Sequence, residues 1–149
     1  DRGNSWTQIN NGLDSLETNI LTVDPNDSET LYLGTDDDGV YKSTDGGESW
    51  KKLTVSSLSK SFGVGDIIVD PQNSNNIYIG TVDYFRLSES RGVLGDFGVY
   101  KSTDGGATWE EFNVGLNHLG VFSLELSEEN RILYAGTRAG GVYWISLDN

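Results

Sequence analysis

An eight-residue motif occurs twice in this chain, and a shortened copy opens it. The two full copies are Ser43–Trp50, which reads STDGGESW, and Ser102–Trp109, which reads STDGGATW. The first residues, Asp1–Trp6, read DRGNSW and match the last six positions of the motif. A motif that recurs at a long spacing indicates that one supersecondary unit is repeated along the chain.

Each repeat contains four short segments in the same order: an apolar run, a Leu-Tyr or Ile-Tyr segment, a Gly-Val-Tyr segment, and the residues after the motif tryptophan. The segments are rich in β-branched and aromatic residues and bounded by Gly, Asn, Asp and Ser, which is typical of strands. No stretch has the apolar spacing of an amphipathic helix over a useful length. The second segments are Leu31–Thr35, Ile77–Thr81 and Leu133–Thr137.

Four short strands in a repeat of about 40–45 residues are the signature of a β-propeller blade. We therefore predict an all-β fold in which residues 1–149 form one propeller segment of three four-stranded antiparallel blades. Blade 1 is expected at about 20–53, blade 2 at about 67–112 with an insertion at 82–97, and blade 3 at about 121–146. Blade 3 lacks a fourth strand, and residues 5–10 have the sequence of one, so they should complete it in cis or in trans.

The motif has a structural explanation. Asp and Ser/Thr side chains bond nearby backbone N–H groups and fix a tight turn, and Gly supplies the positive φ angles that such a turn needs. The tryptophan begins the outer strand, where its indole can be buried between neighbouring sheets. An active site needs one asymmetric set of groups, so an aspartate that recurs in every copy is not a catalytic candidate. We expect no catalytic residue, and we assign to these turns Asp1, Gly3, Trp6, Ser43, Asp45, Gly47, Trp50, Ser102, Asp104, Gly106 and Trp109.

The pattern Ser-x-Asp-x-Gly-x-Ser/Thr-Trp resembles the Asp-box, also called the bacterial neuraminidase repeat. Sialidases, family 74 xyloglucan hydrolases, sortilin-type receptor domains and a photosystem II assembly factor carry this motif. The resemblance implies a propeller in which the box lies in the turn between the third and fourth strands of a blade, as a marker of the fold and not as a reactive site. The segment Ile20–Trp50 is most similar to the family 74 and photosystem assembly branches.

The resemblance to hydrolases does not place catalytic groups in this chain. A sialidase would need an arginine triad and a Tyr–Glu nucleophile pair, and neither can be assigned. A family 74 glycosidase would need two opposed carboxylates roughly 5–10 Å apart. Asp66 and Asp83 have the required chemistry, but nothing in the sequence marks out a pair. In that family the acid and the base come from separate propeller domains, so this chain would supply half at most.

We therefore predict a non-catalytic propeller module with a structural, self-assembling or adhesive role, acting through blade-edge pairing and the inserted loop. The alternative is a fragment of a secreted carbohydrate-active enzyme or glycan-binding protein. A third possibility is a protein-binding scaffold for a larger complex. Binding and release of reducing sugar on a panel of polysaccharides would distinguish the first two.

The insertion in blade 2 is the clearest departure from the repeat. Seventeen residues separate Gly80 from Gly98, where the other two repeats have four. Aromatic and Arg side chains on an exposed loop are typical of a contact surface. The alternative is that Tyr84 or Phe97 packs the loop onto its own blade. The candidate contact residues are Tyr84, Phe85, Arg86, Arg91, Phe97 and, in the connection between blades 2 and 3, His118.

The chain is strongly acidic, with 23 Asp and Glu against 10 Lys and Arg and a net charge of −13. Its basic residues are scattered, which argues against a nucleic-acid partner, because phosphate binding needs a basic face. The absence of cysteine excludes a disulfide framework and thiol-based metal or nucleophile chemistry. No apolar run approaches the roughly 20 residues of a membrane span. We expect an extracellular or cell-surface protein that needs no cofactor.

The densest acidic cluster is Asp36-Asp37-Asp38, between the second and third segments of blade 1. Carboxylates on a loop can bind Ca²⁺, so Asp36 and Asp38 are candidate ligands, but the loop lacks the other ligands of a recognisable cage. The other repeats do not have this cluster. The alternative is a solvated turn.

Three blades are too few to close a ring, since propellers have about 4–8. We expect the chain to associate with itself, either as two copies that close a six-bladed ring or as an open filament, or else to be joined to further blades of a longer polypeptide. Extracellular polysaccharide is a further candidate partner.

Overall fold

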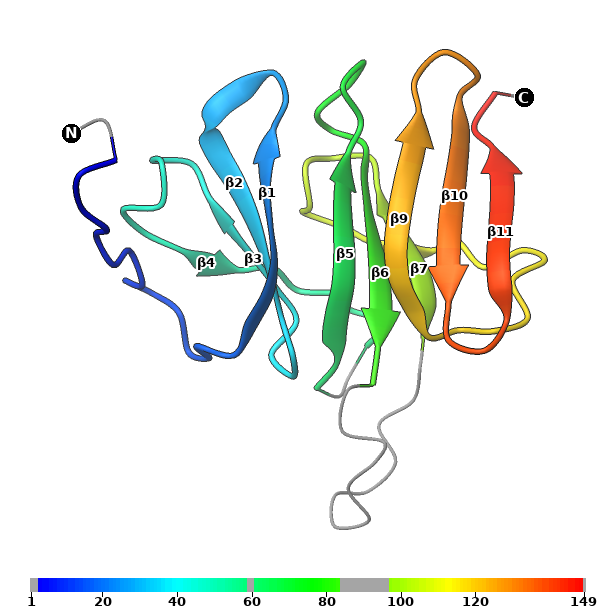
Figure 1. Ribbon diagram of the computed structural model, residues 1–149, viewed down its shortest axis with the longest axis horizontal. Helices are drawn as coiled ribbons and strands as arrows, with labels where there is room; N and C mark the ends of the chain where they lie inside the picture. Colours follow the sequence, from blue (N-terminus) through cyan, green and yellow to red (C-terminus); the bar gives the residue numbers. More distant parts are fainter. Residues whose placement is uncertain (1–2, 59–60, 84–96, 149) are drawn as a thin grey trace, which may run out of the picture.

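The computed structural model describes residues 3–58, 61–83 and 97–148, and it contains eleven strands within them. The strands form three antiparallel sheets that stand side by side, which confirms the predicted all-β fold of propeller blades (Figure 1). No helix in the described part of the chain is long and apolar enough to cross a membrane. The strands are β1 (Thr18–Asp24), β2 (Asp27–Thr35), β3 (Val40–Ser43), β4 (Lys51–Lys52), β5 (Gly63–Val69), β6 (Ile77–Val82), β7 (Gly98–Ser102), β8 (Glu110–Glu111), β9 (Val121–Ser127), β10 (Ile132–Thr137) and β11 (Gly141–Ser146).

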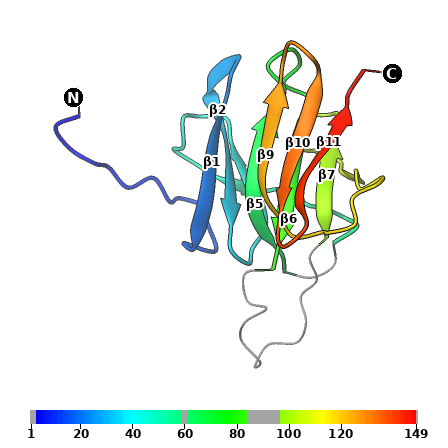
Figure 2. The same ribbon diagram turned by 45° about the vertical axis from the view of Figure 1, so that its right-hand side comes forward.

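Each sheet is a simple antiparallel meander. Blade 1 has the order β1-β2-β3-β4, blade 2 the order β5-β6-β7-β8, and blade 3 the order β11-β10-β9. The first strands of the three blades, β1, β5 and β9, lie next to one another in the middle of the molecule (Figures 1 and 2). The turns β2–β3 and β10–β11 lie at the lower end of the blades in Figure 1. The motif turns between the third and fourth strands do not lie at that end.

The side chains of the second strand alternate between the two faces of each blade, as strand geometry requires. In β2, Tyr32 packs into the cluster shared with blade 2, whereas Leu31 and Leu33 pack with Tyr41 and Trp50 on the opposite face. Full burial of one such aliphatic or aromatic side chain contributes about 1.5–3 kcal/mol. The blades are therefore held together mainly by apolar contact between their broad faces.

Blade 2 is covered on both faces. Ile77 and Ile79 face blade 1 together with Trp109, and Tyr78 and Val99 face blade 3. This central sheet carries most of the fully buried side chains, because each outer blade has a neighbour on one side only.

The N-terminal segment does not complete blade 3 within the same chain. Residues 5–10 form no strand, and Trp6 is fully exposed. The three blades form an open arc in which the N-terminal segment lies beside blade 1 and β11 lies at the far end (Figure 1). The predicted completion in cis is therefore wrong for the single chain, and completion in trans stays a prediction.

Candidate functional site

The two motif turns make the same hydrogen bonds. Ser43 Oγ donates to Asp45 Oδ1 over 2.7 Å and accepts the N–H of Gly47 over 2.9 Å. Asp45 Oδ1 also accepts the N–H of Ser49 over 2.9 Å. In blade 2 the same contacts are made by Ser102, Asp104, Gly106 and Thr108. This geometry is compatible with the Asp-box assignment. Of the N-terminal copy, Asp1 lies outside the described residues, and Gly3 has the positive φ of the other two copies.

Hydrogen bonds lower the pKa of Asp45 and the pKa of Asp104 to about 2. For Asp45 the largest cause is the bond from the Ser49 hydroxyl, followed by that from Ser43. For Asp104 the hydroxyl and the N–H of Thr108 contribute most. Bonds donated to a carboxylate favour its charged form. Both side chains are therefore ionised acceptors that hold their own turns.

An acidic hollow lies at the other end of blade 1, and its lining comes from two distant parts of the sequence. Asp14 and Glu17 belong to the segment before β1, and Asp37 and Asp38 belong to the β2–β3 turn. The N–H of Asp36 donates to the carbonyl of Glu17 over 2.9 Å and joins the two segments. The hollow has a volume of about 480 Å³ and is lined by Asp14, Ser15, Leu16, Glu17, Asp37, Asp38 and Ser61.

The two calcium candidates differ in their contacts. Asp38 accepts a hydrogen bond from the Tyr41 hydroxyl and forms an ion pair with Lys52. Burial by itself raises the pKa of Asp38, but the bonds from Lys52 and Tyr41 outweigh it, so the pKa is lowered. Asp36 Oδ1 is buried and has no hydrogen-bond partner in the part of the chain that the structure describes. Among the described residues no group of three or more His, Cys, Asp or Glu could hold a metal ion, so calcium binding stays a prediction.

Asp66 is a half-buried carboxyl on the innermost strand of blade 2. Its Oδ1 accepts the N–H of Ile67 and its Oδ2 accepts the N–H of Leu124 in blade 3, each over 2.8 Å. Burial raises the pKa of Asp66 despite these two donors. Asp66 lies opposite Gly80 as Ile20 lies opposite Gly34, so a carboxyl replaces an apolar side chain at this position of the repeat.

Asp83, the other carboxyl considered for hydrolysis, is buried at the end of blade 2. Its backbone carbonyl accepts a bond from Arg138 Nη2 over 3.0 Å. The Arg138 guanidinium also lies 5.1 Å from the ring centre of Phe122, which is exposed at the start of β9. Sequence reasoning missed this Arg–aromatic contact, because Phe122 lies in an apolar run that is typical of a core strand.

Most of the predicted contact loop lies outside the described residues, including Tyr84, Phe85, Arg86 and Arg91. Phe97 is half-buried and packs against the cluster between blades 1 and 2. Phe97 is therefore packed in part as the alternative expected, though against two blades, and a contact role for it stays a prediction. His118 is exposed, and its Nδ1 lies 3.0 Å from the Tyr143 hydroxyl of blade 3.

One structural ion pair was also missed from the sequence. Arg131 Nη1 and Nη2 donate to the two carboxylate oxygens of Asp70 over 2.9 and 2.6 Å. The Asp70 side chain is fully buried. This bidentate pair joins the end of β5 to the β9–β10 turn, and so joins blade 2 to blade 3.

Comparisons with known proteins match this chain to one protein family and to several xyloglucanases. Residues 1–144 match the Sortilin-Vps10 family, described as sortilin, neurotensin receptor 3. A xyloglucanase of Paenibacillus sp. is 34% identical over 104 residues, which cover 60% of this chain and 10% of that protein. Xyloglucanase Xgh74A of Acetivibrio thermocellus is 30% identical over 140 residues, which cover 86% of this chain and 16% of that protein. The chain thus spans only a small part of the length of these relatives.

Solved structures with the same fold include an ancestral GH74 enzyme, with a TM-score of 0.64 and 26% identity over 89% of this chain and 15% of that one. The extracellular domain of a hybrid two-component system from B. thetaiotaomicron has a TM-score of 0.66 and 16% identity over 100% of this chain and 19% of that one. The second likeness concerns the fold alone. Because the family match extends over nearly the whole sequence, this chain belongs to the Sortilin-Vps10 family.

Proposed function

We propose that this chain is a segment of an extracellular carbohydrate-active enzyme of the xyloglucanase type and that it contributes part of the glycan-binding face. The observation that carries the proposal is the 30% identity to a xyloglucanase along 86% of the chain. The fold of the ancestral GH74 enzyme supports it as well. These findings favour the carbohydrate-active alternative over the purely structural role predicted first.

The acidic hollow is the part of the chain best suited to hold a sugar. Ligand sites are concave, and ionised carboxylates accept the hydrogen bonds that sugar hydroxyls donate. Asp14 and Glu17 are exposed, whereas Asp37 is half-buried and accepts a bond from Ser15 Oγ over 3.4 Å. A net charge of −13 disfavours acidic polymers, so we infer that the glycan is neutral.

Binding without hydrolysis is the expected behaviour of this chain alone. Hydrolysis of a glycosidic bond needs two carboxyl groups at a set separation. Asp66 has the raised pKa that suits a proton donor, but the chain spans only a tenth to a sixth of its xyloglucanase relatives. We infer that the opposing carboxyl group lies in another part of the enzyme.

Affinity electrophoresis in gels that contain xyloglucan, a mixed-linkage glucan or polygalacturonate tests the proposal. Retardation by a neutral glucan, no retardation by the acidic polymer, and no release of reducing sugar are expected. Failure to bind any neutral glucan would contradict the proposal.

A matched pair of variants locates the binding site. The double variant Asp14→Asn and Asp37→Asn removes two charged acceptors from the hollow and should weaken binding about a hundredfold or more, since each bond to a charged group is worth about 1.5–3 kcal/mol. The control variant Glu128→Gln and Glu129→Gln removes two charges from the β9–β10 turn at the other end of the blades and should bind as the wild type does. Equal loss in both would place the site elsewhere.

A structural or adhesive role through strand-edge pairing is the second candidate. The open edge of β11 favours it, because β11 pairs with β10 alone among the described strands. Exposed strand edges pair readily with other chains.

A further inference from the structure

Trp50 shows how the tryptophan of the motif packs in this fold. It packs with Leu31, Leu33 and Tyr41 of its own blade, and Leu13 from the segment before β1 lies against the same cluster. Its indole N–H donates to the carbonyl of Ile9 over 2.8 Å. Trp109 lies in the equivalent place in blade 2, beside Ile77, Ile79 and Tyr100. Both tryptophans are almost fully buried, at 5% and 7% exposure.

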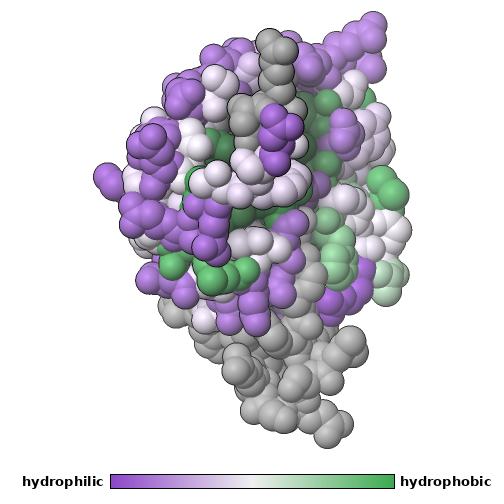
Figure 3. All heavy atoms as spheres, turned by 60° about the vertical axis from the view of Figure 1, so that its left-hand side comes forward, coloured by the Kyte–Doolittle hydropathy of each residue, from purple (hydrophilic) through white to green (hydrophobic). Residues whose placement is uncertain are grey.

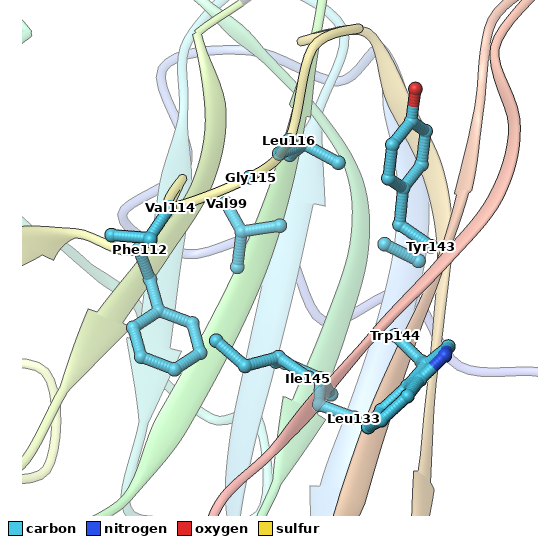
Figure 4. A pocket seen from close by; sticks show the side chains of 10 residues that line it. Val99, Phe112, Val114, Gly115, Leu116, Leu133, Tyr143, Trp144 and Ile145 are labelled. Atoms are coloured by element: carbon cyan, nitrogen blue, oxygen red, sulfur yellow. The ribbon is translucent and has the colours of Figure 1, made fainter.

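Blade 3 has the same arrangement of side chains around a cavity. Trp144 is among the residues that line this cavity, but no residue of blade 3 stands at the position of Trp50. Leu133, Ala135 and Tyr143 stand at the positions of Leu31, Leu33 and Tyr41 in the repeat. Together with Leu116 they line a cavity of about 100 Å³. Figure 4 shows Leu133, Ile145, Val99, Phe112 and Leu116 around it, with the Tyr143 ring at one side.

A glycine beside the cavity also indicates that blade 3 can accommodate a tryptophan there. Gly12 has a φ of 92°, and a Cβ there would lie 2.3 Å from the carbonyl oxygen of Trp50. Gly115 occupies the same place in the sequence Asn-x-Gly-Leu before blade 3 and has a φ of 81°, but no atom of the described residues lies within 4 Å of its Cβ position. In blade 1 this left-handed glycine lets the tryptophan backbone approach, and blade 3 keeps the same backbone shape.

The N-terminal segment has the complementary parts. Ile9 Cδ1 lies 2.5 Å from the Cβ position of Gly47, as Leu53 Cδ1 lies 2.7 Å from that of Gly106. Trp6–Ile9 therefore lies on blade 1 where Trp50–Leu53 lies on blade 2, which is the place of a fourth strand. Trp6 is fully exposed there.

The residues at the end of β11 differ from the motif turn of the other blades. Ile145 and Leu147 stand where Ser43 and Asp45 form the motif turn of blade 1. Both pack against the cluster of blade 3, and the N–H of Leu147 donates to the carbonyl of Arg131 over 2.7 Å. The sequence at this point lacks the side chains that form the motif turn in the other blades. In the described part of the chain, blade 3 has three strands and the edge of β11 is unpaired.

We propose that residues 3–9 of a second copy of this chain add to β11 as the fourth strand of blade 3, with Trp6 of that copy in the cavity. Tyr41 lies opposite Lys52 and Lys42 opposite Lys51 in blade 1. The same register places Gln8 of the second copy opposite Tyr143 and Thr7 opposite Trp144. The added strand hydrogen-bonds the open edge of β11.

The contact is head-to-tail, because the donor segment and the acceptor edge lie at opposite ends of the arc (Figure 1). Two copies that each donate and accept one strand make six blades, which lies within the range of about 4–8 blades in closed propellers. The contact does not depend on glycan binding, so either proposal can fail alone.

Cross-linking tests the register, because the chain has no cysteine of its own. Thr7→Cys mixed with Trp144→Cys should form a covalent heterodimer under mild oxidation, since directly opposed residues on paired strands have Cβ atoms about 4.5–5.5 Å apart. Thr7→Cys mixed with Glu128→Cys, which is exposed in the β9–β10 turn, is the control and should not. No heterodimer in the first mixture, or equal yields in both, overturns the proposal.

Sedimentation equilibrium tests the contribution of Trp6. The wild-type chain should have twice its mass of 16.3 kDa at micromolar concentration, and Trp6→Ala should have the mass of one chain. Leu16→Ala, which also removes an exposed apolar side chain, should associate like the wild type. If the wild-type chain forms species larger than a dimer and Trp6→Ala abolishes them, the same contact joins the copies in an open filament. A wild-type chain that stays single overturns the proposal.

Discussion

Asp70 and Arg131 show how single residues join the blades of this chain. The carboxylate is fully buried, and the guanidinium binds both of its oxygens. Burial raises the pKa of Asp70, but bonds donated by Arg131, Gln72 and Asn76 outweigh burial, so the pKa is lowered. A charge in this setting depends on its partner, because an unpaired buried carboxylate is costly.

Arg131→Met should lower the free energy of unfolding by about 3–5 kcal/mol, since it leaves Asp70 buried and unpaired. Urea denaturation followed by tryptophan fluorescence measures the change. The double variant Asp70→Leu and Arg131→Met removes both charges and should recover part of the loss. A loss below about 1 kcal/mol in the single variant would show that the pair behaves like an exposed one.

Asp104→Asn should destabilise the chain at neutral pH but not in acid. The folded pKa of about 2 lies below the ordinary value of 3.8, so the carboxylate adds stability above about pH 4, and this stability is lost as the pH falls toward 2. Melting temperatures of both proteins between pH 2 and 7 should therefore converge at the acid end. A constant difference across this range would contradict the role assigned to the charge.

At the scale of elements, the tryptophan of the motif is buried in one copy and exposed in another. Trp109 lies among buried side chains of blades 1 and 2, whereas Trp6 stands on a segment that pairs with none of the described strands. The sequence motif is similar in both, so burial follows from the strands that are present around it.

Trp109→Ala should lower the free energy of unfolding by about 3–5 kcal/mol, as for other buried aromatic residues. Trp6→Ala should change it by no more than about 0.5 kcal/mol when measured at low protein concentration, because the side chain is exposed in the single chain. Chemical denaturation of both variants compares them directly. Equal losses would contradict the difference in packing.

The strands could be predicted where the same segment recurs in the other repeats of the chain. The segment Leu31–Thr35 was recognised from its two copies, and it lies within β2. The fourth strands were harder to predict, since β4 and β8 have two residues each and pairing alone defines them. The failure to complete blade 3 in cis could not be foreseen, because strand sequence does not say on which side of an arc a segment will lie.

The candidate site was predicted less completely than the fold. Asp14 and Asp37 line one hollow although they are far apart in the sequence, and only the fold brings them together. In the sequence, Asp66 is a candidate by residue type alone. The signal that distinguishes it is the apolar Ile20 at the same place in blade 1, which an alignment on the Asp-Pro ends of the two runs would have shown.

At the scale of the whole molecule, the chain is an open arc with an incomplete sheet at one end. At the blade 1 end, hydrophobic side chains form small areas among a mainly hydrophilic surface (Figure 3). Leu21 and Val23 of β1 are among the exposed apolar residues. At the blade 3 end, Tyr134, Val142 and Trp144 are exposed, although the equivalent Tyr32 and Val40 of blade 1 are buried against blade 2. Faces that are covered inside the arc are therefore open at its end.

Hydrogen–deuterium exchange measured at two protein concentrations tests most directly whether Trp6–Ile9 is a fourth strand that pairs with β11. The amides of Trp6–Ile9, and those amides of β11 that do not already bond β10, should exchange rapidly in dilute solution and become protected together when the concentration is raised. The strand β6 in the centre of the arc should stay protected throughout. Unchanged rapid exchange of Trp6–Ile9 and of the outward-facing amides of β11 at high concentration would contradict it.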